Sequence, residues 1–314
     1  MATLLTSGFA PSYGDAYPSL SKKLRIQAQR LMKLRQFVKP EPGFGLNKGD
    51  TKAINKFSAP ARGTRALSEL APMPVGSIKQ GQLLVTVAEQ GYSLQYTGKK
   101  ESLADYNVDD PYQKALKLDM AVAMDKMMGD QFVSTDVSLK RSTGAITTNG
   151  ANETGGVALT TAMLRMMVAW LEEGNNISPA KEPTPYYDNA NNYILVGSPN
   201  LIRGLLDDTA SNSITDVGKY AHPEDIYQGE VGMYDSVRII KENSYFSNTN
   251  GYGAGVLFGD DPVVELVALN EEVRYQEADF GRAKGIGWYY LGGAQIMWLY
   301  ADTTIVQPRI INIP

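Results

Sequence analysis

The sequence predicts an α+β fold, with helices in the middle of the chain and strands on both sides of them. Residues 110–134 form one long uninterrupted helical pattern, whereas the last third of the chain consists of short β-prone runs. Strands and helices do not alternate regularly, as they would in a parallel βαβ sheet. With 43% hydrophobic and 20% charged residues over 314 positions, the chain can build a core and is not of the disordered class.

The composition argues against catalysis and against a bound metal. Cysteine is absent and His222 is the single histidine, which excludes a disulfide framework, a thiolate site and a multi-histidine metal centre. Adjacent acidic pairs such as Asp109-Asp110 sit at helix ends or point to opposite faces of strands, so none forms a catalytic dyad by position. We therefore predict no catalytic residue, no cofactor, no metal site and no enzyme activity. An α+β enzyme or a carbohydrate-binding module stays open as an alternative.

The sequence contains no predicted membrane span or secretory leader. No run of 18 uninterrupted apolar residues occurs, and no basic residue precedes Lys22. We expect a protein that is made and acts in the cytoplasm of its host, without a membrane partner.

Charge is distributed unevenly along the chain. Residues 1–100 carry 15 Lys and Arg against 5 Asp and Glu, whereas residues 101–314 carry 15 against 29. A basic end on an acidic body predicts that the end meets an anionic partner. That partner is either nucleic acid or the acidic body of a neighbouring copy.

The first 56 residues resemble an arm more than a domain, because prolines and glycines interrupt any regular pattern. One amphipathic helix is predicted between residues 21 and 37, with an apolar stripe and basic residues around it. Such a helix can dock on its own chain or on another subunit. We favour a clasp between subunits, with DNA contact secondary, since an apolar stripe has no use on a phosphate backbone. The stripe consists of Leu24, Ala28, Leu31 and Leu34.

Residues 57–97 are predicted to form a long β-hairpin. Tyr92, Leu94 and Tyr96 alternate with polar residues in the returning strand, and residues 72–76 form a tip rich in proline and glycine. A turn alone cannot hold a hairpin of this length. The hairpin must therefore lie on the body of this chain or on another one.

The long helix is expected to begin at Asp110, followed by Pro111, and to reach residue 134. Its stripe of methionines is interpreted as core filling rather than as a ligand groove. A second helix is predicted over 160–173, and Ser198 with Pro199 starts a third one after the strand 193–196. The β-prone runs of the last third are 238–240, 256–258, 263–269, 287–290 and 296–300.

One stretch of the chain carries a family resemblance. The stretch Lys219–Gly232, followed by 234–240, resembles the "KYA…E…GE-G…VR-I" segment of major capsid proteins of tailed bacteriophages. These proteins have the HK97-like fold, and the most similar branch is the one typified by phage N4. Further pieces occur in the expected order, so the resemblance covers roughly residues 57–306. They are the long helix, the loop 147–156, the helix 160–173, the strand-to-cap segment 194–199 and the stretch around Gly287-Trp288 and Gly292-Gly293.

The resemblance implies a division of the chain and a function. It implies an N-terminal arm (1–56), an extended hairpin loop (57–97), a peripheral domain (98–158) with a spine helix (110–134), an axial domain (159–255) and return strands (256–314). The implied function is self-assembly, in hexamers and pentamers, into an icosahedral shell around double-stranded DNA that is bound without sequence specificity. Scaffolding, portal and decoration proteins are candidate partners, and the location is the virion after assembly in the host cytoplasm. An encapsulin-type nanocompartment is the alternative within the fold.

Contacts between subunits are expected from the arm, the hairpin and the tyrosine-containing motif. The candidate residues are Leu24, Leu31, Leu34, Met73, Val75, Ile78, Tyr92, Tyr96, Tyr220 and Tyr227.

Overall fold

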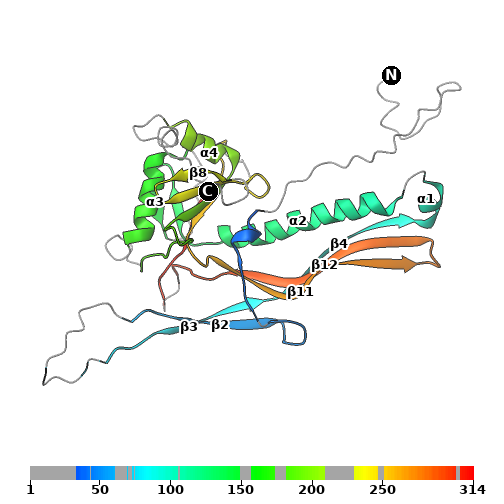
Figure 1. Ribbon diagram of the computed structural model, residues 1–314, viewed down its shortest axis with the longest axis horizontal. Coiled ribbons are helices and arrows are strands. Elements are labelled where there is room, and N and C mark those ends of the chain that lie inside the picture. Colours follow the sequence, from blue (N-terminus) through cyan, green and yellow to red (C-terminus); the bar gives the residue numbers. More distant parts are fainter. Residues whose placement is uncertain are drawn as a thin grey trace.

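The computed structural model shows an elongated molecule with three parts (Figure 1). A seven-stranded sheet with two helices lies at one end, a long helix on a four-stranded sheet extends to the other end, and a two-stranded hairpin projects separately. The structure describes residues 33–42, 44–60, 69, 73, 75–104, 107–148, 157–173, 182–208, 230–246, 251–301 and 305–314. Within these ranges, no helix combines the length and apolar character needed to span a membrane.

The four-stranded sheet has the order β1-β11-β12-β4. Strand β1 runs parallel to β11, and the other neighbours are antiparallel. A short helix, α1 (Gly98–Leu103), follows β4 at the far end of the sheet. The strands are β1 (Lys39–Pro40), β4 (Ala88–Thr97), β11 (Val263–Ala278) and β12 (Ala283–Ile296).

The long helix α2 (Asp109–Val133) packs along this sheet. It begins one residue before the predicted start, and its first turn carries Asp109 and Asp110, whose charges favour a helix N-terminus. The predicted core-filling role of the stripe Leu116, Met120, Met124 and Met127 is confirmed, because Leu116 and Met124 are buried in the core and Met120 and Met127 pack against it. The pattern therefore reflects packing rather than a ligand groove.

The seven-stranded sheet has the order β6-β5-β13-β10-β7-β9-β8. Its strand β7 (Tyr193–Gly197) is buried along its whole length, and its alternate residues face different cores. Ile194 and Val196 belong to the core under α2, whereas Tyr193 and Leu195 face α3 (Thr161–Glu173) and α4 (Pro199–Leu206). The other strands are β5 (Ser138–Lys140), β6 (Ala145–Thr147), β8 (Glu230–Tyr234), β9 (Val237–Lys241), β10 (Gly255–Phe258) and β13 (Ile310–Ile313).

The predicted extent of the hairpin is wrong. Its strands are β2 (Thr51–Phe57) and β3 (Gln80–Thr86), so the first strand comes from the predicted arm. Residues 88–97, predicted as the returning strand, pair with β12 instead. The alternation at Tyr92, Leu94 and Tyr96 arises because one face of this strand lies under α2. A hairpin strand with one buried face would show the same alternation, so the pattern does not identify the pairing partner.

Two further boundaries differ from the expected division. The pair β5–β6 lies in the seven-stranded sheet, although that division assigns residues 138–147 to the peripheral domain. The end of the predicted arm also belongs to the body, because residues 35–37 form a short 3-10 helix, η2 (Arg35–Phe37), with Leu34 and Phe37 in the core. Burial of these two side chains fixes the segment to its own chain.

Candidate assembly surfaces

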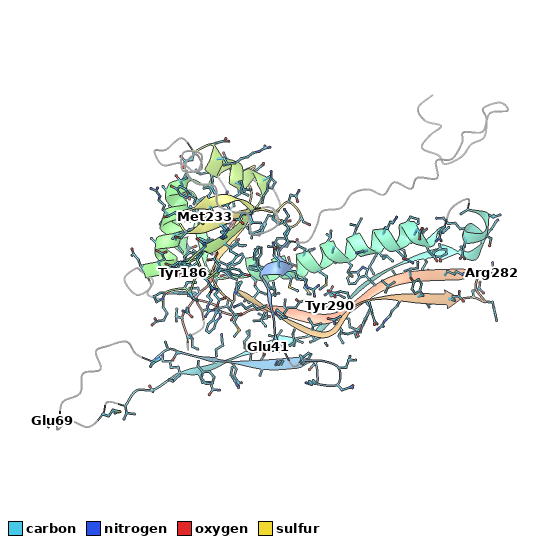
Figure 2. The ribbon with its side chains drawn as sticks, viewed as in Figure 1. Glu41, Glu69, Tyr186, Met233, Arg282 and Tyr290 are labelled. Atoms are coloured by element: carbon cyan, nitrogen blue, oxygen red, sulfur yellow. The ribbon has the colours of Figure 1, made fainter. Side chains whose placement is uncertain are left out.

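The β2–β3 hairpin exposes a series of apolar side chains, here called the hairpin surface. Val75 is 98% exposed and Met73 is 72% exposed. Glu69 marks the tip of this projection, at the opposite end of the molecule from Arg282 (Figure 2). Apolar groups gathered on a projecting element indicate a contact with another protein. The surface consists of Phe57, Met73, Val75, Ile78 and Leu84.

The base of the hairpin is fixed to the body. The Lys56 ammonium is buried, donates a hydrogen bond to the Met297 carbonyl over 3.2 Å and lies 5.6 Å from the centre of the Trp298 ring. The Arg309 guanidinium lies 4.1 Å from the same ring centre. Such cation–π contacts orient the ring and the chain that carries it. The hairpin therefore projects at a defined angle.

Gly293 of β12 permits the close approach of the hairpin to the sheet. A Cβ atom at this position would lie 2.2 Å from the carbonyl oxygen of Thr86, the last residue of β3. A backbone atom at that distance cannot be accommodated without moving the strand. The glycine thus sets where the chain passes from β3 into β4.

The described start of the chain is anchored to α2 by a buried carboxylate. Oδ1 of Asp125 accepts the backbone N–H groups of Lys33 and Leu34 at 3.1 and 2.7 Å. Oδ2 has no hydrogen-bond partner among the described residues. Burial is the main cause that raises the pKa of Asp125; the Leu34 N–H opposes it and the negative charge of Glu242 adds to it, and the net pKa is about 6.

Glu242 forms the other half of this junction. Its side chain is fully buried and accepts the backbone N–H groups of Tyr245 and Phe246. The hydroxyl of Tyr245 donates to Asp130 of α2 over 2.8 Å, and its ring occupies the space beside Gly129. The loop after β9 is thereby attached to α2 next to the arm.

A second exposed surface lies at the turn between β11 and β12, at the far end of the sheet (Figure 1). Asp279, Phe280 and Gly281 have φ values of 50°, 52° and 83°. Phe280 is fully exposed. A bulky residue in the left-handed region costs free energy, and such strain clusters at functional positions. We call residues 279–282 the distal tip.

The face of the four-stranded sheet opposite α2 holds a shallow groove of about 570 Å³. Gly91, Ser93 and Gly287 form a floor of small residues. The Arg274 guanidinium lies 3.9 Å from the centre of the Tyr289 ring at its side. Because small residues form the floor of the groove and polar residues its sides, this face of the sheet is accessible to another chain.

The predicted contact residues fall into three groups: exposed residues, residues outside the described ranges, and two residues that are buried in their own chain. Met73, Val75, Ile78 and Tyr92 are exposed, so their assignment as contacts between subunits stays a prediction. The sequence analysis missed Phe280, although the run Asp279-Phe280-Gly281-Arg282 between two β-prone segments is a signal for an aromatic at a turn. Leu24, Leu31, Tyr220 and Tyr227 lie outside the described residues.

The prediction that Leu34 and Tyr96 contact a neighbouring subunit is wrong. Leu34 is 0% exposed and Tyr96 is 8% exposed, because both pack into the core of their own chain. The Tyr96 hydroxyl donates a hydrogen bond to Asp109, which raises the pKa of the phenol. Neither side chain offers surface to a neighbour. Of the motif that carries the resemblance, residues 230–232 lie in β8, and residues 234–240 span the end of β8, the turn after it and most of β9. Arg238 forms ion pairs there with Asp188 and Glu230.

Comparisons with known proteins place this fold. Neither a protein-family model nor a curated protein matches the chain. The head structure of Helicobacter pylori bacteriophage KHP40 matches with a TM-score of 0.69 and 11% identity, covering 98% of both chains. The capsid of Ralstonia phage GP4 matches with 0.67 and 11%, covering 98% of this chain and 97% of that one. The Cyanophage Pam1 capsid matches with 0.65 and 15%, covering 98% of both. The chain therefore has the α+β fold of these phage head and capsid structures, which is the HK97-like fold that the motif resemblance implied.

Proposed function

We propose that the chain is the major structural subunit of an icosahedral viral shell that encloses double-stranded DNA, and that its role is structural rather than catalytic. The observation that carries the proposal is the hairpin surface, which projects from the body with Val75 98% exposed. An isolated protein gains nothing from such a projection. A subunit that lays it on a neighbour buries apolar area at each contact.

Closure of the shell allows individually weak contacts between subunits to hold it together. Each copy in a shell touches several neighbours, so individually weak interfaces act together once the shell closes. Three separate exposed features, the hairpin surface, the distal tip and the sheet groove, supply contacts in different directions. A dimer would use one or two of them, whereas a shell uses all.

The proposal assigns the parts of the molecule as follows. The four-stranded sheet with α2 is the peripheral domain, the seven-stranded sheet with α3 and α4 is the axial domain, and the β2–β3 hairpin is the extended loop. Copies form hexamers and pentamers in the host cytoplasm and end in the virion. Scaffolding, portal and decoration proteins are further partners under this proposal.

We do not retain the encapsulin alternative, because the structures compared above are phage heads and capsids. Nor do the described residues favour an enzyme. None of the described Asp and Glu residues form a group of three arranged to hold a metal ion. The buried carboxylates Asp125 and Glu242 are occupied by backbone N–H groups of their own chain.

The experiment compares assembly with folding. Purified wild-type protein is expected to form closed shells in negative-stain microscopy. A variant with Met73, Val75 and Ile78 changed to Ser is expected to keep the wild-type melting temperature and to lose shells, since these side chains contribute no core. The matched control changes Ser77, Lys79 and Gln80 to Ala on the same exposed hairpin. Normal assembly of the first variant would exclude the hairpin as a contact, and a wild-type protein that stays monomeric would exclude the shell.

A further inference from the structure

The two edges of the four-stranded sheet are protected unequally. On the β11 edge, β1 covers Val264 and Glu265, and two register shifts interrupt the strand between Val267 and Glu272. Bulges, charges and covering segments are the usual means of keeping an edge from pairing with another chain. The β4 edge has little such protection within Ala88–Thr97: its register against β12 is continuous over ten residues, it contains no proline, Glu89 is its only charged residue, and no described strand covers it.

The hydrogen-bond pattern shows which groups of β4 point outward. One position beyond the end of the ladder, the N–H of Gly98 donates to the Arg282 carbonyl over 2.9 Å, so these two residues continue the register as a hydrogen-bonded pair. Since bonded and non-bonded positions alternate along an antiparallel pair, even-numbered residues of β4 bond β12. The odd-numbered ones point their N–H and C=O groups away from it. β4 is the terminal strand of the sheet, so Glu89, Gly91, Ser93 and Gln95 face no described strand.

An exposed aromatic accompanies this open edge. Tyr92 pairs with Trp288 in the ladder, so both side chains lie on the α2 side of the sheet. Trp288 is 5% exposed and its indole N–H donates to Asp119 of α2 over 3.0 Å. Tyr92 is 56% exposed, because α2 covers the neighbouring strand and leaves this position open. The edge thus offers both unpaired backbone groups and apolar area.

We infer that β4 pairs antiparallel with β4 of a second copy of the chain, across a two-fold axis that passes midway between the two Tyr92 residues. The inference names one contact within the proposed shell and rests on that function, since an icosahedral shell supplies two-fold axes. In this register Gly91 faces Ser93 of the second copy, and Glu89 faces Gln95 of the second copy. Each such pair exchanges two backbone hydrogen bonds.

The register follows from the outward residues themselves. It pairs all four of them, and it leaves out Thr97, which caps α1. It also places Tyr92 against its own counterpart as a non-hydrogen-bonded pair, which buries the exposed ring. The single charge, Glu89, meets an amide and not a second carboxylate. A sheet of two four-stranded halves results, with both α2 helices on the same side.

A single cysteine tests this register, because the chain has none of its own. Across the axis, residue 92 lies about 4.5 Å from its counterpart between Cα atoms, which a disulfide can span. Tyr92→Cys is therefore expected to give covalent dimers on mild oxidation of shells. The matched control is Gln95→Cys, on the same exposed strand. In the inferred register it lies about 20 Å from its counterpart and is expected to stay monomeric.

The outcomes separate the inference from the proposed function. Intact shells in which Tyr92→Cys stays monomeric, or in which both variants cross-link equally, would overturn the β4 pairing and leave the shell function standing. If the wild-type protein forms no shells, the proposed function fails, and cross-linking of the Tyr92→Cys protein in solution still decides the pairing.

Amide hydrogen exchange on the wild-type chain gives a second readout that no substitution can disturb. The outward amides of Gly91 and Ser93 are expected to exchange about tenfold more slowly, or slower still, after association. The amides of Tyr92 and Leu94, already bonded to β12, are expected to change little. Equal exchange of Ser93 before and after association would contradict the pairing.

Discussion

The backbone N–H of Leu34 donates a hydrogen bond of 2.7 Å to Oδ1 of Asp125, and both residues are fully buried. This bond joins the start of the described chain to the long helix α2. Among the described residues, no cationic side chain forms an ion pair with this carboxylate, and its second oxygen has no hydrogen-bond partner. The contact therefore depends on whether Asp125 carries a charge.

Acidification is expected to strengthen the protomer through this group. Burial raises the pKa of Asp125 from 3.8 to about 6, so the folded protein holds the proton more tightly than the unfolded chain does. The resulting contribution to stability is complete below about pH 4 and is lost as the pH rises through 6. Asp125→Asn keeps the acceptor oxygen and cannot ionise. Between pH 4.5 and 7.5 the wild type should lose on the order of 2 kcal/mol relative to this variant, measured by urea unfolding of unassembled protein.

Asp125→Ala is the control, since it removes the acceptor as well as the charge. It should be less stable than Asp125→Asn at both pH values, by about 1 kcal/mol or more. Parallel pH profiles for the wild type and Asp125→Asn would show that another group governs the acid response.

The effect of Gly129→Ala on stability should change sign when the neighbouring Tyr245 ring is removed. A Cβ at this position of α2 would lie 2.6 Å from the Tyr245 ring, so Gly129→Ala should destabilise the protein by about 1–3 kcal/mol. When Tyr245 is changed to Ala, the same substitution should stabilise it by roughly 0.5–1 kcal/mol, the ordinary gain of Ala over Gly in a helix. A double-mutant cycle by chemical denaturation measures the difference. Additive effects would mean that the ring does not set the requirement for glycine.

Two glycines of β12 should respond differently to the same change. A Cβ at Gly293 would lie 2.2 Å from the Thr86 carbonyl, whereas one at Gly285 would meet the Gln95 side chain at an ordinary 3.6 Å. Gly293→Ala is therefore expected to cost about 2 kcal/mol or more and to reduce shell yield, because it displaces the hairpin base. Gly285→Ala should change stability by less than about 0.5 kcal/mol. Equal melting temperatures for the two variants would contradict the close approach of β3.

Phe280 at the distal tip is expected to lower the stability of the protomer and to promote contact between subunits. Phe280 is fully exposed at a φ of 52°, so it contributes strain and no packing to its own chain. Asn tolerates this conformation better, and Phe280→Asn should stabilise the protomer by about 0.5–1 kcal/mol while lowering shell yield. Thermal melting and particle counts give the two readouts. A stabilised variant with unchanged yield would remove the distal tip from the assembly surfaces.

The sequence predicted the elements with strong local signals. Ser198 followed by Pro199 marks the start of α4, where the serine side chain accepts the Leu201 N–H. The stripe containing Leu116 and Met124 likewise identified the buried face of α2. Capping and helical periodicity act within a few residues, so they can be recognised without knowing the fold.

Pairing between distant segments was not predictable in the same way. Alternation shows that residues 92–96 form a strand with one buried face, and says nothing about which strand lies beside it. The predicted partner was the hairpin, whereas the actual partner is β12, about 190 positions later. The local sequence around Phe37 is polar and interrupted and so predicts an arm, although its ring packs 5.4 Å from that of Phe258. Only the tertiary fold reveals such contacts.

Two truncations should separate the arm from the body. Deleting residues 1–32 leaves Leu34 and Phe37 in the core, so the unassembled protomer should melt within about 2 °C of the wild type. Deleting 1–37 removes both side chains. Loss of one buried Phe alone costs about 3–5 kcal/mol, a large share of a typical folding free energy. The second truncation should therefore fail to give folded protein, and equal melting of the two would contradict the anchoring of this segment.

The shorter truncation also tests which partner the basic arm meets. Residues 1–56 carry ten Lys and Arg against three acidic residues, and the predicted partner is the acidic body of a neighbouring subunit. Shells made without residues 1–32 should then dissociate at lower denaturant than wild-type shells even when both are empty of DNA. Alternatively, the two kinds of shell could differ in stability only when they are filled, with a stability that falls steeply with salt, as phosphate contacts require. That result would show that the arm binds the packaged DNA and that the predicted clasp between subunits is wrong.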